Sequence, residues 1–279
     1  MLEKLRFASK GLINHFLQES SISSGLNLGL PSYVLIFLTS RCNLSCRYCN
    51  ICSQEAMQKQ ELTIEQWKKA VLKIKAWLGN YYLYITGGEP LIREDIFDLV
   101  IFCKKNNIKV AILTNASLLT KKKIDRFVSI GLDELNISLD SVIEEEYDYI
   151  RRQKGLTRQV MKAIDYINGR IVIQITSVLT KVNLRSIPAL VEYCDKKNMR
   201  LNLNPLIPNL FSRQNTRNLC NELWTSDSRE IDACFDEIIK LKGRSTTIFN
   251  DKKHLELIRA YYKYPNKIIS SFTCPRGHT

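Results

Sequence analysis

Long apolar segments are scarce in this sequence of 279 residues. The run Val34-Leu35-Ile36-Phe37-Leu38 is far shorter than the roughly 20 residues that a membrane-spanning helix needs. Residues 1–10 carry no secretory signal, and nine cysteines are too few, in a chain of this length, for a small disulfide scaffold. We therefore expect a cytoplasmic protein whose thiols are reduced.

Recognition motifs for nucleotides and nucleic acids are also missing. The sequence has neither a Rossmann fingerprint nor a P-loop, so we expect no internal nicotinamide or nucleotide site. Its 41 Lys and Arg residues against 28 Asp and Glu residues give a net charge of +13, which favours anionic partners. These basic residues are scattered and are not interleaved with aromatic residues, so we predict no specific nucleic-acid surface.

The composition is that of an ordinary globular protein, with 45% hydrophobic and 25% charged residues. The length allows two average domains, or one barrel-like core with extensions. We predict an N-terminal amphipathic helix and linker over residues 1–30, an α/β core over 31–210 and a helical extension over 211–279. Within residues 2–17, apolar positions lie among basic ones, and this pattern favours packing against the core over contact with a membrane surface.

Short β-rich runs and longer helical patterns alternate through the predicted core. The expected strands cover residues 33–39, 81–86, 108–114, 133–139, 171–179 and 200–204. The expected helices cover residues 63–78, 92–106, 120–129, 157–168 and 185–197, followed by 226–243 and 251–263. Thr63 and Ser186 stand where helices should begin, and Gly79 and Gly131 stand where helices should end. The repeated β-α order predicts parallel strands in a partial barrel or an open doubly wound sheet, with the active site at the carboxyl ends of the strands.

Three cysteines, Cys42, Cys46 and Cys49, follow directly after the first expected strand. Thiolates are the usual ligands of iron–sulfur clusters, and three of them leave one iron of a four-iron cluster open. The flanking Arg41 and Arg47 are expected to favour the ionised thiols. This loop is therefore a candidate site for a [4Fe–4S] cluster that binds a further ligand.

A zinc site is the alternative for the same residues. Structural zinc usually takes four protein ligands in two pairs. Cys52 forms an overlapping CxxC with Cys49, but no separate CxxC or HxxxH occurs elsewhere in the chain. A non-catalytic zinc-binding or nucleic-acid-binding module is the competing hypothesis.

The CxxxCxxC spacing, with Tyr48 just before the third cysteine, resembles the signature of the radical S-adenosylmethionine (SAM) superfamily. The segment Gly87-Gly88-Glu89-Pro90 matches that family's GGEP motif, and the resemblance covers residues 33–205. It implies a partial (β/α)6 TIM-like barrel, a [4Fe–4S] cluster on the three cysteines, and reductive cleavage of bound SAM to a 5′-deoxyadenosyl radical. It also implies that the GGEP segment binds the SAM amino group and that Tyr48 lies against the adenine.

Polar residues that follow the later strands complete the predicted site. By the same resemblance, Asn115, Ser138 and Asp140 surround the ribose and methionine parts of SAM, although such residues also cap helices and form turns. Arg151 and Arg152 are candidates to pair with the SAM carboxylate, with a solvated basic loop as the alternative. Gln174, Thr176 and the segment Asn202-Leu203-Asn204-Pro205 are candidates for the substrate side of the cavity.

Hydrogen-atom abstraction from a substrate is the expected first step, and these motifs do not identify the substrate. The segment Cys274-Pro275-Arg276-Gly277 resembles the opening of the auxiliary-cluster region, of SPASM or twitch type, in peptide-modifying radical SAM maturases. That likeness favours a peptide or protein substrate. It leaves two alternatives: a chain shortened after Thr279, or a Cys274 that serves no cluster.

The predicted barrel also resembles that of the GTP cyclase of molybdenum-cofactor synthesis. Tyr84 stands where that enzyme has a substrate-binding arginine, and its second three-cysteine cluster is missing. A nucleotide or other small molecule is therefore the second hypothesis for the substrate. In both cases we expect an external flavodoxin or ferredoxin as electron donor.

Overall fold

The computed structural model describes residues 17, 20, 29–49, 51, 61–207 and 222–271. Most of the helix and linker expected over residues 1–30 lies outside the described residues, and so do Cys52, Cys220 and Cys274. Within the described part of the chain, every helix is too short or too polar to cross a membrane.

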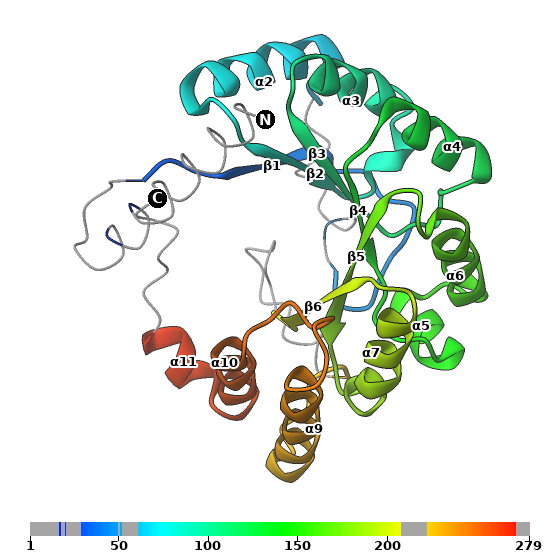
Figure 1. Ribbon diagram of the computed structural model, residues 1–279. Helices are drawn as coiled ribbons and strands as arrows, with labels where there is room; N and C mark the ends of the chain where they lie inside the picture. Colours follow the sequence, from blue (N-terminus) through cyan, green and yellow to red (C-terminus); the bar gives the residue numbers. More distant parts are fainter. Residues whose placement is uncertain are drawn as a thin grey trace.

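Six parallel strands form one sheet in which the spatial order follows the order along the chain. They are β1 (Tyr33–Thr39), β2 (Tyr82–Gly87), β3 (Lys109–Thr114), β4 (Glu134–Ser138), β5 (Val172–Leu179) and β6 (Arg200–Pro205). The strands fan around a common axis, and helices cover their outer side (Figure 1). The expected α/β fold, a partial TIM-like barrel, is confirmed, and the alternative of an open doubly wound sheet is wrong.

Helices connect successive strands as crossovers, and further helices follow the last strand. They are α2 (Ile64–Leu78), α3 (Ile96–Lys105), α4 (Lys121–Ile130), α5 (Glu144–Arg151), α6 (Leu156–Ile167), α7 (Ile187–Lys196), α9 (Ser228–Lys242), α10 (Lys252–Lys263) and α11 (Pro265–Ser271). Two short 3-10 helices, η3 (Pro90–Ile92) and η4 (Leu184–Ser186), precede α3 and α7. Neither α5 nor α11 was expected from the sequence.

Local sequence signals explain most of the helix ends. The Thr63 side chain accepts a hydrogen bond from the backbone N–H of Gln66, whose own side chain bonds back to Thr63 in a capping box. Gly131 ends α4 in the left-handed conformation that glycine adopts without strain. The helix expected at residue 92 begins only at Ile96, because the chain after Glu89 first forms η3. Ser186 precedes α7 as predicted, but its hydroxyl makes no cap bond and donates to a glutamate of α5.

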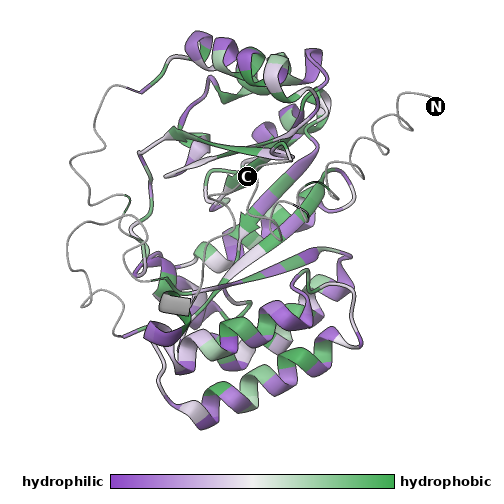
Figure 2. Cartoon of the chain, turned by 90° about the vertical axis from the view of Figure 1, so that its left-hand side faces the viewer, coloured by the Kyte–Doolittle hydropathy of each residue, from purple (hydrophilic) through white to green (hydrophobic). Residues whose placement is uncertain are grey.

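The hydrophobic core lies between the outer face of the sheet and the helices. The outward-facing residues of the central strands, Leu83, Ile85, Val110, Ile112, Leu135 and Ile137, are fully buried. The helices are hydrophobic on one side and hydrophilic on the other (Figure 2). The residues that alternate with the buried ones face the inside of the barrel, so the barrel wall presents their side chains at the carboxyl rim.

The outer edge of β6 is covered by residues 247–250. Leu201 donates a backbone hydrogen bond to Thr247 and accepts one from Phe249, and a single parallel bridge joins Leu201 to Ile248. Helix α9 packs on α10 beyond this segment. The cover removes an edge on which another chain would otherwise pair.

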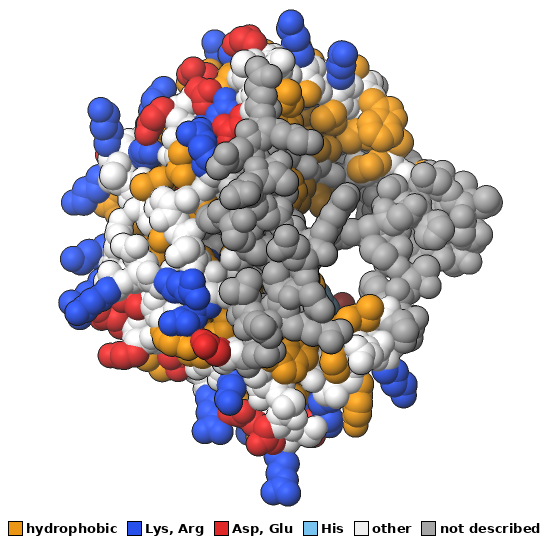
Figure 3. All heavy atoms as spheres, turned by 180° about the vertical axis from the view of Figure 1, so that it is seen from behind, with side chains coloured by type: hydrophobic (Ala, Val, Ile, Leu, Met, Phe, Trp, Pro, Cys, Tyr) orange, Lys and Arg blue, Asp and Glu red, His pale blue; other side chains and the backbone are white. Residues whose placement is uncertain are grey.

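Charged residues are mixed on the surface. On the face drawn in Figure 3, Lys and Arg side chains are spread over the described surface with Asp and Glu among them. Many of the cations pair with carboxylates, as Arg170 does with Asp125 at 2.6 Å and Lys197 with Asp165 at 2.6 Å.

Candidate active site

The cysteine loop leaves β1 at the carboxyl edge of the sheet. Cys46 is buried, while Cys42 and Cys49 are half-buried, and none of the three forms a disulfide. The backbone N–H of Cys49 donates to the carbonyl of Cys46 at 3.1 Å, which closes a turn between them. Burial raises the pKa of the Cys49 thiol, so metal binding would have to displace its proton.

The flanking arginines do not contact these thiols. Arg41 pairs with Glu61 at 3.2 Å, and Arg47 pairs with Glu222 at 3.2 Å while its guanidinium lies 3.8 Å from the ring centroid of Tyr149. The expectation that both arginines favour the ionised thiols is therefore wrong. Each side chain reaches a carboxylate or an aromatic face at the surface instead.

The two glycines of the GGEP segment allow β2 to approach the cysteine loop closely. The backbone N–H of Gly88 donates to Thr39 and that of Glu89 donates to Arg41, both at 2.8 Å. A Cβ atom added to Gly88 would lie 2.2 Å from the Arg41 carbonyl oxygen, and one added to Gly87 would lie 2.1 Å from that of Thr39. Only glycine permits this contact, so the two glycines hold the cysteine loop against β2.

Glu89 is directed into the protein. Its carboxylate is fully buried and accepts hydrogen bonds from the backbone N–H groups of Leu91 and Asn115 and from the hydroxyl of Thr114, at 2.8–3.0 Å. Burial raises the pKa of this carboxyl group, and the three donors counteract that rise. The side chain thus ties β2 to the end of β3, which holds Asn115 at the rim.

Asn115 contacts the cysteine loop directly. Its amide nitrogen lies 3.9 Å from the Cys42 sulfur and 3.2 Å from the side-chain oxygen of Asn43, and its oxygen accepts from Ser117. Ser138 ends β4 at the same rim and is half-buried. Both positions agree with the rim placement that the sequence predicts.

Helix α5 holds the other side of the cysteine loop. The backbone N–H of Arg47 donates to Ile150 at 2.9 Å, and its side-chain Nε donates to the carbonyl of Tyr149 at 2.9 Å. From the end of the same helix, Arg151 extends an N–H toward the Cys46 sulfur, 3.6 Å away. The cysteine loop is therefore held on one side by Gly88 and Glu89 after β2, and on the other side by α5, a helix that was not expected from the sequence.

Asp140 and Tyr48 complete this buried contact. Asp140 is fully buried, accepts the backbone N–H of Val178 at 2.9 Å, and pairs with Arg151 at 2.8 Å. The Tyr48 hydroxyl donates to the same carboxylate at 3.2 Å, and burial raises the pKa of that hydroxyl. Arg152 is exposed at the C-cap of α5, one residue past the side chain that turns inward. Of the two candidate arginines, Arg151 therefore lies against the cysteine loop, whereas Arg152 takes the left-handed C-cap conformation and is exposed.

The inner face of β4, β5 and β6 carries several polar side chains. Thr176 donates to the Asn136 side chain at 2.7 Å, and Asn202 donates to Asn204 at 3.1 Å. Gln174 lies beside them in register, half-buried. Gln174, Thr176, Asn202 and Asn204 therefore lie on one face of the sheet, whereas the candidate Leu203 is buried in the core on the other face.

The residues present fit the ligand set of an open iron–sulfur cluster. Three thiols lie in one loop, and two of them receive N–H groups: Cys46 from Arg151, and Cys42 from Asn115 and the backbone of Leu44. Within the described ranges, no three His, Cys, Asp or Glu side chains converge as ligands of a single ion. A cluster does not require such convergence, because each thiolate binds a different iron.

Comparison with known proteins gives one family and several partial relatives. The family model described as Radical SAM superfamily matches residues 36–194, more than half of the chain. PqqA peptide cyclase of Bradyrhizobium diazoefficiens is 27% identical over 175 residues, which cover 62% of this chain and 46% of that protein. GTP 3′,8-cyclase of Chlorobaculum tepidum is 32% identical over 180 residues, which cover 63% of this chain and 54% of that protein. The chain thus spans about half the length of the curated relatives it matches.

Among solved structures, Streptococcus suis SuiB bound to S-adenosylmethionine superposes with a TM-score of 0.67. The sequence identity is 18%, and the match covers 92% of this chain and 57% of SuiB. At this identity the likeness supports the fold.

Proposed function

The chain belongs to the radical SAM superfamily, and from this premise we propose that it is an enzyme that cleaves SAM reductively and abstracts hydrogen from a peptide or protein substrate. The observation that carries the proposal is the cysteine loop, which the GGEP backbone and helix α5 hold from two sides. Three thiols fixed in this way leave room for a fourth, exchangeable ligand at the cluster.

When bound, the cluster and SAM supply a 5′-deoxyadenosyl radical, and the protein's own residues supply position. Cys42, Cys46 and Cys49 would hold the cluster. Gly87 and Gly88 hold the end of β2 against the loop, and their backbone is proposed to contact SAM. Tyr48, Asn115 and Ser138 lie around the same rim and are proposed to contact SAM, whereas Glu89 and Asp140 are proposed to hold the rim segments in place.

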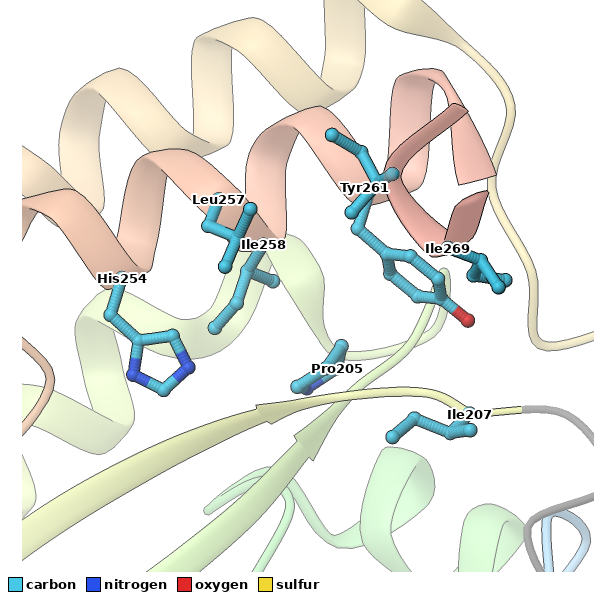
Figure 4. Close-up of a pocket in the computed structure, with 8 residues that line it drawn as sticks. Pro205, Ile207, His254, Leu257, Ile258, Tyr261 and Ile269 are labelled. Atoms are coloured by element: carbon cyan, nitrogen blue, oxygen red, sulfur yellow. The ribbon is translucent and has the colours of Figure 1, made fainter. Parts of the chain in front are cut away.

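A peptide substrate is supported by the relatives and by the surface beside the rim. PqqA peptide cyclase shares the matched region. An apolar groove follows the end of β6, with Pro205 and Ile207 on one wall and Leu257, Ile258 and Tyr261 of α10 on the other (Figure 4). Apolar side chains of a peptide fit such a lining better than the phosphates of a nucleotide.

A nucleotide or small molecule is the second candidate. GTP 3′,8-cyclase is similar over 63% of the chain, and the polar inner wall at Gln174, Thr176 and Asn202 would suit a small polar substrate. Tyr84, half-buried on β2, stands where the GTP-cyclising enzyme is expected to carry an arginine. For either substrate we propose an external flavodoxin or ferredoxin as the electron source.

Anaerobic reconstitution with iron and sulfide, followed by dithionite and SAM, tests the proposal by the release of 5′-deoxyadenosine. We expect product from the wild-type chain, loss of product with Cys46→Ala, and retention with Cys234→Ala, a half-buried cysteine on α9. A colourless protein that binds zinc would refute the proposal. Substrate class is then separated by adding candidate peptides or nucleotides and measuring which one accelerates SAM cleavage.

A further inference from the structure

A buried ion pair lies directly against one of the cluster cysteines. Arg151 ends α5 with its side chain only 6% exposed, and one terminal nitrogen pairs with the buried Asp140 at 2.8 Å. The other terminal nitrogen lies 3.6 Å from the Cys46 sulfur. Its guanidinium also lies 5.3 Å from the ring centroid of Tyr48 and 5.2 Å from that of Tyr147, so four groups fix its position.

This arrangement is costly for folding alone. Desolvating two charges often cancels the gain from their attraction, so a buried pair is weak evidence for stability. Among the described residues, the buried Nε of Arg151 has no hydrogen-bond partner, which adds to the cost. An apolar side chain of similar volume often serves folding as well, so the buried cation points to a role other than stability.

We propose that Arg151 is a positioning residue that raises the reduction potential of the cluster through the Cys46 sulfur, and that Asp140 limits the size of this effect. Hydrogen bonds to cluster sulfurs and local charge both set the potentials of iron–sulfur clusters. A cation at the sulfur favours the reduced cluster, which carries one more negative charge. The proposal rests on the proposed function, because it assigns a role toward the same cluster.

The geometry supports an effect of Arg151 through the Cys46 sulfur, rather than through its charge at a distance. Asp140 is anchored by the backbone N–H of Val178, so it sets the direction of the guanidinium. The segment that carries Cys46 is held by a hydrogen bond from the backbone N–H of Arg47 to the carbonyl of Ile150, one residue before Arg151. The donor and the sulfur therefore belong to two segments that are locked together, and their separation is fixed by the fold.

The test is the midpoint potential of the reconstituted full-length protein, followed by electron paramagnetic resonance in an anaerobic redox titration. Arg151→Met should shift the potential to more negative values, and Asp140→Asn should shift it to more positive values. Arg158→Met removes an exposed guanidinium that pairs with Glu144 on the surface, and it should leave the potential unchanged. If Arg151 and Asp140 have only a structural role, the potentials of the first two variants should shift in the same direction or not at all. Either result would overturn the proposal.

Arg151→Met leaves a buried carboxylate without its partner, so a second pair of variants covers a failure to fold. The double variant Arg151→Met with Asp140→Asn has no uncompensated charge, and its potential should lie below that of Asp140→Asn alone. Arg151→Lys should restore part of the shift. If the Arg151 variants have the same potential as the wild type and only their affinity for SAM falls, Arg151 acts on SAM and the proposal is wrong. A wild-type protein without any cluster would instead refute the proposed function.

Discussion

Replacing Gly88 with alanine should separate the cysteine loop from β2. The added Cβ would lie 2.2 Å from the Arg41 carbonyl oxygen and 2.6 Å from its carbon, whereas real Cβ atoms stay at least 3.0 Å away. The two segments must therefore move apart by about 0.8 Å. Both backbone bonds between them, now 2.8 Å long, would be stretched.

The expected cost is about 2–4 kcal/mol of unfolding free energy, from overpacking of about 1–3 kcal/mol and weakening of two hydrogen bonds worth about 1 kcal/mol each. A displacement of this size at a reacting centre lowers the rate of SAM cleavage by roughly a hundredfold. Urea unfolding followed by circular dichroism measures the first quantity. Release of 5′-deoxyadenosine from the reconstituted protein, normalised to bound iron, measures the second.

Gly243→Ala is the matched control, because Gly243 has an ordinary backbone angle and the nearest atom to an added Cβ lies 3.4 Å away. It should change neither quantity appreciably. If Gly88→Ala bound iron fully and cleaved SAM at the wild-type rate, the close approach of β2 would not be what positions the loop. Equal losses in both variants would show that the assay reports general damage.

Three further substitutions test other contacts. Glu89→Gln places an amide donor against a buried backbone donor and should cost about 1–3 kcal/mol in urea unfolding, with a lower cluster content. Tyr262→Phe removes a hydroxyl that bonds two backbone groups at 2.6 and 2.8 Å, and should destabilise the chain by about 1–2 kcal/mol without changing the visible spectrum of the cluster. The hydrogen bond from Arg93 lowers the pKa of Asp95 from its usual 3.8, so this carboxylate stabilises the fold above that pH and loses its effect as the pH falls through the lowered pKa. The difference in unfolding free energy between wild type and Asp95→Asn should therefore be constant above about pH 5 and shrink in more acid solution.

The spacing of apolar residues was sufficient to predict the strands and most helices, because only the positions that face the core need to be apolar. Residues such as Leu83 and Ile85 on β2 are fully buried against helices, and their neighbours face the barrel interior. Every second position is therefore apolar or aromatic. Gly131 and Thr63 marked helix ends because each satisfies backbone groups that a helix leaves open.

Helix α5 was missed because it is short and polar. It begins with Glu144, Glu145 and Glu146, and only Tyr147 and Ile150 are apolar residues buried on its inner side. Tyr147, Tyr149 and Ile150 are the only apolar or aromatic residues among its eight, and they do not form a periodic pattern. The acidic first turn is nevertheless favourable at a helix N-terminus, and that was the signal available in the sequence.

Closeness in the sequence also failed to identify the arginine that lies against a cysteine thiol. Arg41 stands directly before Cys42, yet its side chain is 60% exposed and paired, so water and Glu61 screen its field. Arg151 lies 105 residues after Cys46 in sequence and 3.6 Å from its sulfur in the structure. A charge in a buried contact acts through a lower effective dielectric than one at the surface. Substitution of Arg41 should consequently change the surface charge and leave the cluster potential almost untouched, whereas the distant arginine should move it.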